Sequence, residues 1–403
     1  MSSSSNTKRR PLLKDFQVPE SSVWKLSGAH VLNDLMTTGL VPALLPLYKA
    51  AFHLSYIETT LIVLVSYITS SIIQPISGLI TDRHPFVWLL PIGVFCTCFG
   101  LAISGIVPNY ALLMGCIALS GFGSGTFHPE ASRATNLAAG ENRGLTQSIF
   151  QVGGNLGQAV GPLMMPLFII TLGLHGLLWF LIAAVLAFLL TWWVLPRYKQ
   201  QIRKGEAKKT VAEGKRGRLG IILLVLVVAI RSWAQIGIVS FLPFYYLEQH
   251  IPLGTGDLMT FVFLFAGAIG TLIGGTISDR IGRKWLLMGS MILTIPFAWL
   301  LPTMHGLNAG VDLFFFGFFI LSSFAVTVVY GQMMLPNNIG LASGLMIGFG
   351  VGAGGIGATF MGWIADHYAV STVLDIIAIL PIIAAIITFF LPNDKKLVRL
   401  RLK

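Results

Sequence analysis

Three polar side chains interrupt an apolar stretch near the start of the chain. His30, Asn33 and Asp34 stand at positions i, i+3 and i+4, so in an α-helix they share one face. A histidine and a carboxylate at this spacing lie about 5–6 Å apart at Cβ and can share or exchange a proton. Ionisable groups in long apolar segments are costly and usually functional. The spacing predicts that His30 and Asp34 carry a proton, and the alternative is a static buried ion pair.

A second group of this kind consists of His128, Glu130 and Arg133, with Pro129 after the histidine. It lies in another long apolar segment, at a similar depth to the first group. Proline lacks a backbone donor, which loosens a helix locally and frees a carbonyl group. We predict that His128 and Glu130 are proton-coupling residues, again with a static ion pair as the alternative. The pattern leaves open which of the two groups carries the proton.

Two further apolar segments carry polar side chains that suit contact with a substrate. Gln147, Gln151 and Asn155 recur at four-residue spacing and form one stripe of a glycine-rich helix. Arg231 is the basic residue nearest to the middle of such a segment, and a guanidinium there needs an anion. That anion is either a carboxylate of the protein or a phosphate, phosphonate or carboxylate group of the substrate. We predict that Arg231, the stripe and Asn33 contact the substrate.

A charged turn predicts a gate at one face of the protein. The segment Gly275 to Lys284 places a carboxylate at the end of a helix and three cations next to it. Such a carboxylate can pair with a neighbouring arginine or helix end only while the loops on that side are packed together. An earlier copy of the pattern ends in His84 and Pro85 instead of further basic residues, and the alternative for both is charge that only sets orientation. The predicted gating residues are Asp82, Arg83, Asp279, Arg280 and Arg283.

Long apolar runs occupy most of the 403 residues. The chain is 55 % hydrophobic and 11 % charged, and its mean hydropathy is +0.79, which a soluble globule would not show. A bilayer core about 30 Å thick needs roughly 20 apolar residues per helix. We therefore predict an all-α membrane protein with twelve transmembrane helices in two six-helix bundles. The predicted spans are residues 24–48, 57–81, 87–107, 110–133, 144–171, 175–195, 220–247, 257–279, 284–303, 311–333, 341–366 and 371–391.

The basic residues predict the orientation of these spans. With both termini in the cytoplasm, 25 of the 27 Lys and Arg residues fall on the cytoplasmic side. Residues 78–83 and 275–280 share the pattern Gly-x-x-x-Asp-Arg, and internal duplication of this kind is typical of transporters. The predicted divisions are a cytoplasmic N-terminal tail (1–23), an N-terminal bundle (24–195), a basic cytoplasmic linker (196–219), a C-terminal bundle (220–391) and a cytoplasmic C-terminal tail (392–403).

Several classes of function find no support in the sequence. The net charge of +11 would suit nucleic acid in a soluble protein, but here the basic residues flank the spans, where they suit anionic lipid. Cys96, Cys98 and Cys116 all lie in apolar segments without metal-ligand spacing. The first 23 residues are polar and predict no cleaved signal peptide. We expect no enzyme, metal site or cofactor, no nucleic-acid partner, and a monomer in contact with membrane lipid.

The gate and three polar strings resemble known transporters. Residues 275–284 resemble the signature loop of the major facilitator superfamily. Gly157-x-x-x-Gly161-Pro162 resembles the antiporter motif of drug exporters, without its trailing glycines. The strings SGAHVLND (27–34), FHPEASR (127–133) and QSIFQVGGN (147–155) resemble the bacterial fosmidomycin-resistance family of efflux proteins. The resemblance implies efflux of a phosphonate antibiotic across the bacterial inner membrane, driven by protons, with Arg231 as the anion partner.

The combined expectation is a proton-coupled secondary transporter that exports a small anionic drug such as fosmidomycin by alternating access. A proton symporter that imports a small organic anion would use the same residues, and a membrane protein without transport activity would need an added domain or catalytic set. The natural substrate, the direction of transport and the proton stoichiometry stay open at this point.

Overall fold

The computed structural model describes residues 20–83, 86–138, 143–205, 218–335 and 339–393, and this part of the chain is helical without any β-strand. One group of helices, here the N-half, comprises α1 (Ser21–Asp34), the π-helix η1 (Leu35–Leu40), α2 (Val41–Ala43), α3 (Leu45–Phe52), α4 (Tyr56–Arg83), α5 (Leu89–Ile103), α6 (Tyr110–Ala138), α7 (Arg143–Val160), η2 (Gly161–Leu163), η3 (Met165–Ile169), α8 (Ile170–Leu172), η4 (Gly173–Phe180), α9 (Leu181–Trp192) and α10 (Leu195–Gly205). The other, the C-half, comprises α11 (Arg218–Glu248), α12 (Leu253–Ile281), α13 (Arg283–Leu300), η5 (Leu301–Thr303), α14 (Gly306–Ser322), α15 (Phe324–Met334), α16 (Ile339–Met346), α17 (Gly348–His367) and α18 (Val370–Phe389).

The twelve predicted spans correspond to these elements. Within the described residues, nine helical segments are long and apolar enough to cross a membrane. A tenth is the pair Ser21–Ala43 and Leu45–Phe52, which bends by 54°. Leu89–Ile103 is apolar but shorter, and α7 is the remaining span, rich in glycine and glutamine. The predicted all-α class and the twelve-helix fold are therefore confirmed.

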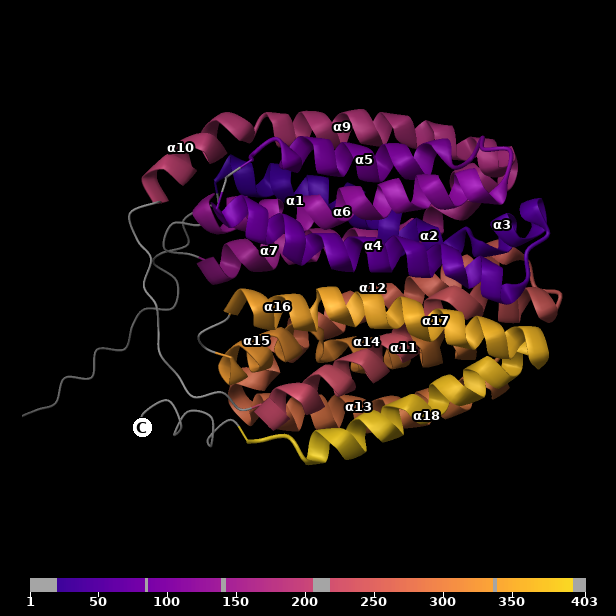
Figure 1. Cartoon of the computed structure of the whole chain (residues 1–403). Coiled ribbons are helices and arrows are strands. Elements are labelled where there is room, and N and C mark those ends of the chain that lie inside the picture. The colour runs from indigo at the N-terminus through magenta and orange to yellow at the C-terminus, as the bar shows by residue number, and fades with distance from the viewer. Residues whose placement is uncertain (1–19, 84–85, 139–142, 206–217, 336–338, 394–403) are drawn as a thin grey trace, which may run out of the picture.

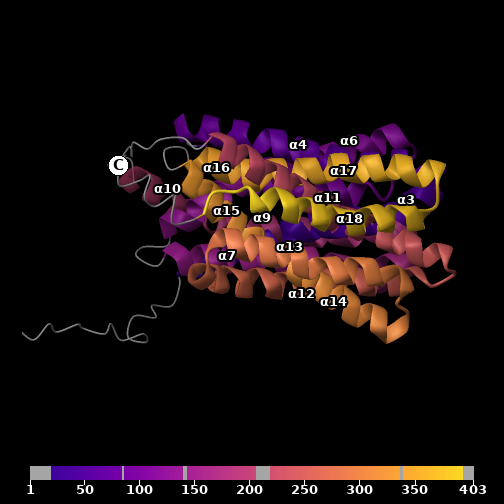
Figure 2. The same ribbon diagram turned by 90° about the horizontal axis from the view of Figure 1, so that it is seen from below.

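The two halves lie side by side and meet along two seams (Figure 1). Helix α4 packs against α17 in one seam, and α7 packs against α12 in the other. Figure 2 shows the two seams on opposite sides of the bundle. We call the end of the bundle where α10 ends and α11 begins the linker end, and the opposite end, which carries α3, the far end (Figure 1).

The first part of the predicted linker is helical. Residues 195–205 form α10, which packs against α6. Tyr198 is fully buried and Ile202 is nearly so, because α10 turns one face toward the N-half. The many basic residues of this segment hid its apolar face at the sequence level.

Hydrogen bonds join the two halves at the far end. The carboxylate of Asp366, on α17, accepts hydrogen bonds from the backbone N–H groups of Tyr56 (2.6 Å) and Ile57 (2.8 Å), which begin α4. The Tyr56 hydroxyl donates to Glu248, at the end of α11, at 3.1 Å. A carboxylate is favourable at a helix N-terminus, where the first N–H groups have no partner within the helix. These contacts hold the far end closed.

Glycines allow the helices of the C-half to approach one another closely. A Cβ atom on Gly270, Gly274 or Gly317 would collide with a backbone carbonyl oxygen of the facing helix, α14 for the first two and α12 for the third. Helices in a membrane gain no hydrophobic driving force from one another, so close contact between small residues supplies much of their association. The α12–α14 pair therefore depends on these positions.

We expect Gly317→Val to destabilise the protein, because the added methyl groups would push α14 away from the carbonyl of Phe263. Overpacking of this kind costs about 1–3 kcal/mol. The midpoint of thermal unfolding in detergent should fall well below that of Gly289→Val, the matched control, since a Cβ on Gly289 meets no atom within 4 Å. Equal midpoints for the two variants would contradict the packing argument.

Candidate functional site

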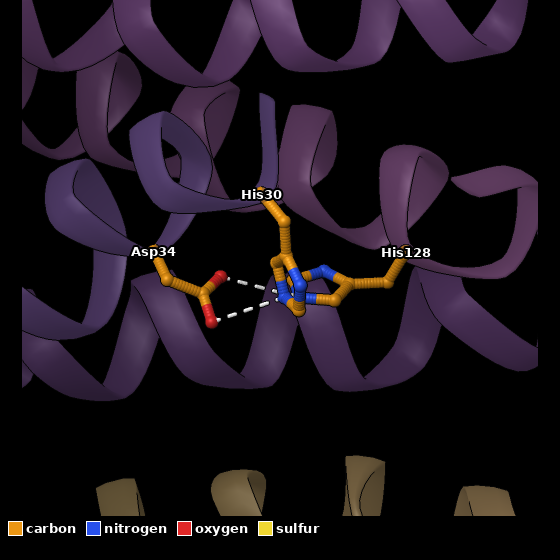
Figure 3. Close-up of side chains that lie close together, drawn as sticks. All are labelled: His30, Asp34 and His128. Carbon is orange, nitrogen blue, oxygen red and sulfur yellow. Dashed lines mark ion pairs between the residues drawn. The ribbon is translucent and has the colours of Figure 1, made fainter. Parts of the chain in front are cut away.

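Two histidines from different helices face one carboxylate in the N-half (Figure 3). His30 and Asp34 lie one turn apart on α1, and the His30 Nε2 atom is 3.2 Å from Oδ2 of Asp34. His128, on α6, places its Nε2 atom 3.2 Å from the other carboxylate oxygen, Oδ1. The fold thus joins His128 to the predicted His30–Asp34 pair, and we call these three residues the His–Asp–His cluster.

The other nitrogen of each imidazole ring also faces an oxygen atom. His30 Nδ1 is 2.8 Å from the backbone carbonyl of Phe150 on α7. The imidazole ring of His30 also stacks on the phenyl ring of Phe150, with the ring centroids 4.1 Å apart. His128 Nδ1 is 2.8 Å from the backbone carbonyl of Ser124, one turn earlier on α6. A carbonyl or carboxylate oxygen only accepts hydrogen bonds, so each ring satisfies both contacts when both of its nitrogens carry a proton. The arrangement can therefore store protons.

The three ligand atoms of the cluster lie within 4.8 Å of one another, which is a spacing that a transition-metal ion can also bridge. Hydrogen bonds of ordinary length account for each contact, and we assign no metal to this group of side chains.

Neighbouring residues shape the cluster from three helices. Asn33 donates hydrogen bonds to Asp34 at 2.9 Å and to the Ser124 hydroxyl at 3.1 Å, which ties α1 to α6. Gly154, on α7, leaves room for the cluster, since a Cβ atom there would collide with the side chains of His30 and Asp34. The π-helix η1 begins directly after Asp34, and such π-segments are frequent at functional sites.

Pro129 frees a carbonyl group, as the sequence predicts. Helix α6 continues through Pro129, which has no N–H to offer the carbonyl of Gly125. The hydroxyl of Ser77, on α4, donates to that carbonyl at 3.1 Å instead. Because of the proline, which directly follows His128, the Gly125 carbonyl is bonded to α4 and not to a residue of α6.

Glu130 points away from the cluster. Its carboxylate is buried and accepts a hydrogen bond from the hydroxyl of Tyr198, on α10, at 2.6 Å. Arg133 lies 4.0 Å from its other oxygen and also donates to the carbonyl of Thr81 at 2.7 Å. The residues of the second predicted group thus divide, with His128 at the cluster and Glu130 in a polar contact between α6 and α10.

A small cavity lies between the two halves, and it includes the predicted residue Asn155. Its lining residues are Asn155 and Gln158 of α7, Gln235 of α11, Leu264, Gly267, Ala268 and Thr271 of α12, Leu321 of α14 and Phe324 of α15. Amide side chains from both halves thus meet at one place in the seam between α7 and α12.

Arg231 lies beside this cavity. It is 2 % exposed, its Nη1 atom donates to Gln235 at 3.3 Å, and its guanidinium lies 5.1 Å from the ring centre of Phe324. Its Nε atom has no hydrogen-bond partner, and no carboxylate of the described residues lies within ion-pair distance. Arg231 is therefore a buried cation without an anion, and it contacts two residues that line the cavity, Gln235 and Phe324.

The remaining predicted substrate residues occupy different places. Gln151 is half-buried on α7, one turn from Asn155, and is not among the residues that line the cavity. Gln147 lies on the same helix, but its side chain falls outside the described part of the structure. Asn33 contacts the His–Asp–His cluster, as described above. Of the predicted substrate residues, Asn155 thus lines the cavity, and Arg231 contacts two of the lining residues.

The predicted gate lies at the end of α12. Asp279 pairs with Arg283 at 3.0 Å across the turn between α12 and α13, inside the C-half. Arg280 is exposed in the last turn of α12. Asp82 and Arg83 end α4, and their side chains lie outside the described part.

The structure adds buried acidic residues that the sequence analysis did not single out. Asp257 of α12 and Asp312 of α14 are buried near the far end. Neither carboxylate oxygen of Asp257 has a hydrogen-bond partner, and the same is true of one oxygen of Asp312. Both acids stand at the start of predicted apolar spans, which was the available signal. Tyr198 gave no such signal, because it lies among basic residues.

Comparison with known proteins identifies relatives along most of the chain. The family model of the Major Facilitator Superfamily matches residues 26–256 and 224–402. The chain is 37 % identical over 376 residues to the fosmidomycin resistance protein of Escherichia coli (strain K12), with 92 % of each chain covered. It is 34 % identical over 397 residues to YfnC, an uncharacterized MFS-type transporter of Bacillus subtilis (strain 168), with 95 % of this chain and 97 % of that one covered.

Solved structures show the same fold. The xylose transporter XylE from E. coli, in a partially occluded inward open conformation, superposes with a TM-score of 0.69 at 14 % identity, with 92 % of this chain and 100 % of that one covered. An inward-facing, unoccupied bacterial homolog of the human lysosomal transporter Spinster gives a TM-score of 0.71 at 14 % identity, with 94 % and 97 % covered. At this identity the likeness concerns the fold alone.

We expect Tyr198→Phe to destabilise the protein, because it removes the hydroxyl that donates to the buried carboxylate of Glu130. An unsatisfied buried acceptor costs about 1–3 kcal/mol, so the midpoint of thermal unfolding in detergent should fall. The fall should be smaller when Glu130→Met is already present. Tyr368→Phe, at an exposed tyrosine, is the control. An equal fall in both backgrounds would mean that the hydroxyl acts elsewhere.

Proposed function

The chain belongs to the major facilitator superfamily and is a multi-pass membrane transporter, and on that premise we propose that it exports a small anionic compound such as fosmidomycin in exchange for protons. The similarity to the fosmidomycin resistance protein of E. coli supports the substrate class. Fosmidomycin is a phosphonate, and a phosphonate group is an anion that arginine binds well.

The observation that carries the proposal is the position of Arg231. A buried guanidinium without an anion is costly, so a protein keeps one where an anion will bind. The neighbouring amides of Gln235 and Asn155 can donate hydrogen bonds to the same ligand from opposite halves. A ligand held from both sides would draw the two halves together around it.

The proton side of the exchange is assigned to the His–Asp–His cluster. Asp34 with two histidines can gain or lose protons without leaving a lone buried charge, because the cluster contains groups of both signs. We assign Glu130 a smaller part, since it points away from the cluster, with one oxygen bonded to Tyr198 and the other 4.0 Å from Arg133.

Orientation follows from the basic residues. We place the linker end in the cytoplasm and the far end outside the inner membrane of a bacterium, since Lys and Arg of the described part gather at the linker end. In this orientation, Asp366 and Glu248 close the outer side of the transporter. The described conformation is then one stage of alternating access, in which the outer side is shut.

For exchange, protons and drug must bind competitively, since a ligand shifts a conformational equilibrium only through its different affinity for the two states.

We expect Arg231→Ala to abolish fosmidomycin resistance in a drug-sensitive bacterium that expresses this chain, and Arg231→Lys to restore little of it. Lysine keeps the charge but loses the paired donors that suit a phosphonate. Leu226→Ala, on the lipid-exposed face of the same helix, is the control at matched protein abundance. Wild-type resistance in Arg231→Ala would exclude Arg231 as the anion partner.

We expect Asp34→Asn to abolish proton-driven transport of fosmidomycin in inverted membrane vesicles, because the amide leaves the two histidines without a carboxylate to share. Asp375→Asn, an exposed carboxylate on α18, is the matched control and should transport normally. The same vesicles test direction: a wild-type protein whose protons and substrate move together would be an importer of organic anions. Full activity of Asp34→Asn would remove the cluster from the coupling mechanism.

A further inference from the structure

Asp257 is a buried carboxyl group that the exchange described so far does not use. It is 0 % exposed, and neither carboxylate oxygen has a hydrogen-bond partner among the described residues. Glu130, which is as deeply buried, has both a tyrosine hydroxyl and an arginine beside it. Asp257 therefore lacks the compensation that buried acids normally have.

The position of Asp257 connects it to the path between the cavity and the far end. On α12 it precedes the cavity residues Leu264 and Thr271 by seven and fourteen residues, so all three lie along one face of the helix. Gly254, one turn closer to the far end, approaches Pro166 and Ile170 of the N-half: a Cβ atom there would lie 3.7 Å from each. Along α12, Asp257 thus lies between the cavity and the contact that Gly254 makes with the N-half at the far end.

Titratable groups near this level do not neutralise Asp257. Helix α12 packs against α11, α13, α14 and α15 in the C-half and against α7, η2 and η3 in the N-half. Pro243 of α11 lies opposite Gly256, and Arg231 stands twelve residues before it, about 18 Å along the helix axis. Helix η3 carries no titratable residue. The titratable residues at the far end of the other packed elements are Tyr245, Tyr246 and Glu248 of α11, His250 in the turn after it, and Asp312 of α14.

A carboxylate ion buried without a partner is unfavourable enough that the group takes up a proton instead. In the described conformation Asp257 is sealed between the helices, and the far end is closed by Asp366 and Glu248. Opening the far end would separate α12 from η3 and admit water to this face of α12, where the ionised form is stable. The two conformations of the far end would therefore differ in the proton content of Asp257.

We propose that Asp257 is a second proton-binding site, which takes up a proton from the outer solution when the far end closes and returns it when the far end opens. The proposal rests on the exchange proposed above, because it adds a proton step to the outer gate of the same cycle. Closure at the far end then requires the acid form of Asp257, so an acidic outer solution favours the return of the empty transporter. The proton binds reversibly to one carboxylate oxygen, and no other bond changes.

The test follows the far end directly and uses no substrate. Cysteines replace Ala51 on α3 and Leu307 on α14, two exposed residues at the far end of opposite halves, after the native cysteines are changed to serine. Spin labels on them report the distance between the halves by pulsed electron resonance in lipid nanodiscs. In the wild type we expect the distribution to shift from short to long distances as the buffer becomes alkaline. In Asp257→Asn, which is always uncharged, we expect only the short distance at every pH.

Two results would overturn the proposal. One is a pH-dependent shift in Asp257→Asn equal to that of the wild type; the other is the absence of any shift in the wild type. Asp312→Asn is the matched control and should keep the wild-type shift, whereas loss of the shift in that variant alone would assign the effect to Asp312 and equally overturn the proposal. If the asparagine variant fails to fold, Asp257→Ala gives the same uncharged state. A wild type that does not transport fosmidomycin would refute the proposed substrate but leave this distance measurement unaffected.

Discussion

The structure depends on one constraint: within a membrane, every polar group must find its partner inside the protein. Asp34 satisfies it by sharing its two oxygens between His30 and His128. The carbonyl that Pro129 releases finds the hydroxyl of Ser77, and the Glu130 carboxylate finds Tyr198. Apart from the His30–Asp34 pair, which lies within α1, each of these contacts joins two helices, so the polar groups help to fix which helices of the N-half stay together.

Where the constraint is not met, the structure points to a ligand or to motion. Arg231 lacks an anion at the cavity between the halves, and Asp257 lacks a donor on the face of α12 that leads outward. Both of these charged groups lie in the C-half, whereas the Asp34 carboxylate in the N-half is paired with two histidines. The contacts across the far end are of a different kind, since Asp366 binds free N–H groups at the start of α4. Water can satisfy those groups equally well once the halves separate, so the closure is reversible.

Periodicity within a single helix was sufficient to predict part of the site. The spacing of His30 and Asp34 fixes their contact on α1 whatever the rest of the fold does, and apolar length fixes the spans. Contacts between helices depend on the rotation of each helix about its axis, which one sequence does not reveal. The spacing of His128 and Glu130, two residues apart on one helix, indicates that they point to different sides of α6, but it does not reveal which of the two meets Asp34. Tyr198 was hidden because its helix is apolar on one narrow face only.

Helix α7 connects the proton-binding side to the central cavity. The carbonyl of Phe150 faces His30 Nδ1 at 2.8 Å and can only accept a hydrogen bond from it, and Gly154 packs directly against the cluster. The next residue, Asn155, lies in the same turn and lines the cavity. A helix is stiff over so short a distance, because each residue is bonded to the one four positions away. The Ser27 hydroxyl donates to the carbonyl of Ile149 at 2.9 Å, so two neighbouring carbonyls of α7 face polar side chains of α1. A movement of α1 relative to α7 at the cluster therefore acts within one turn on the residue of α7 that lines the cavity.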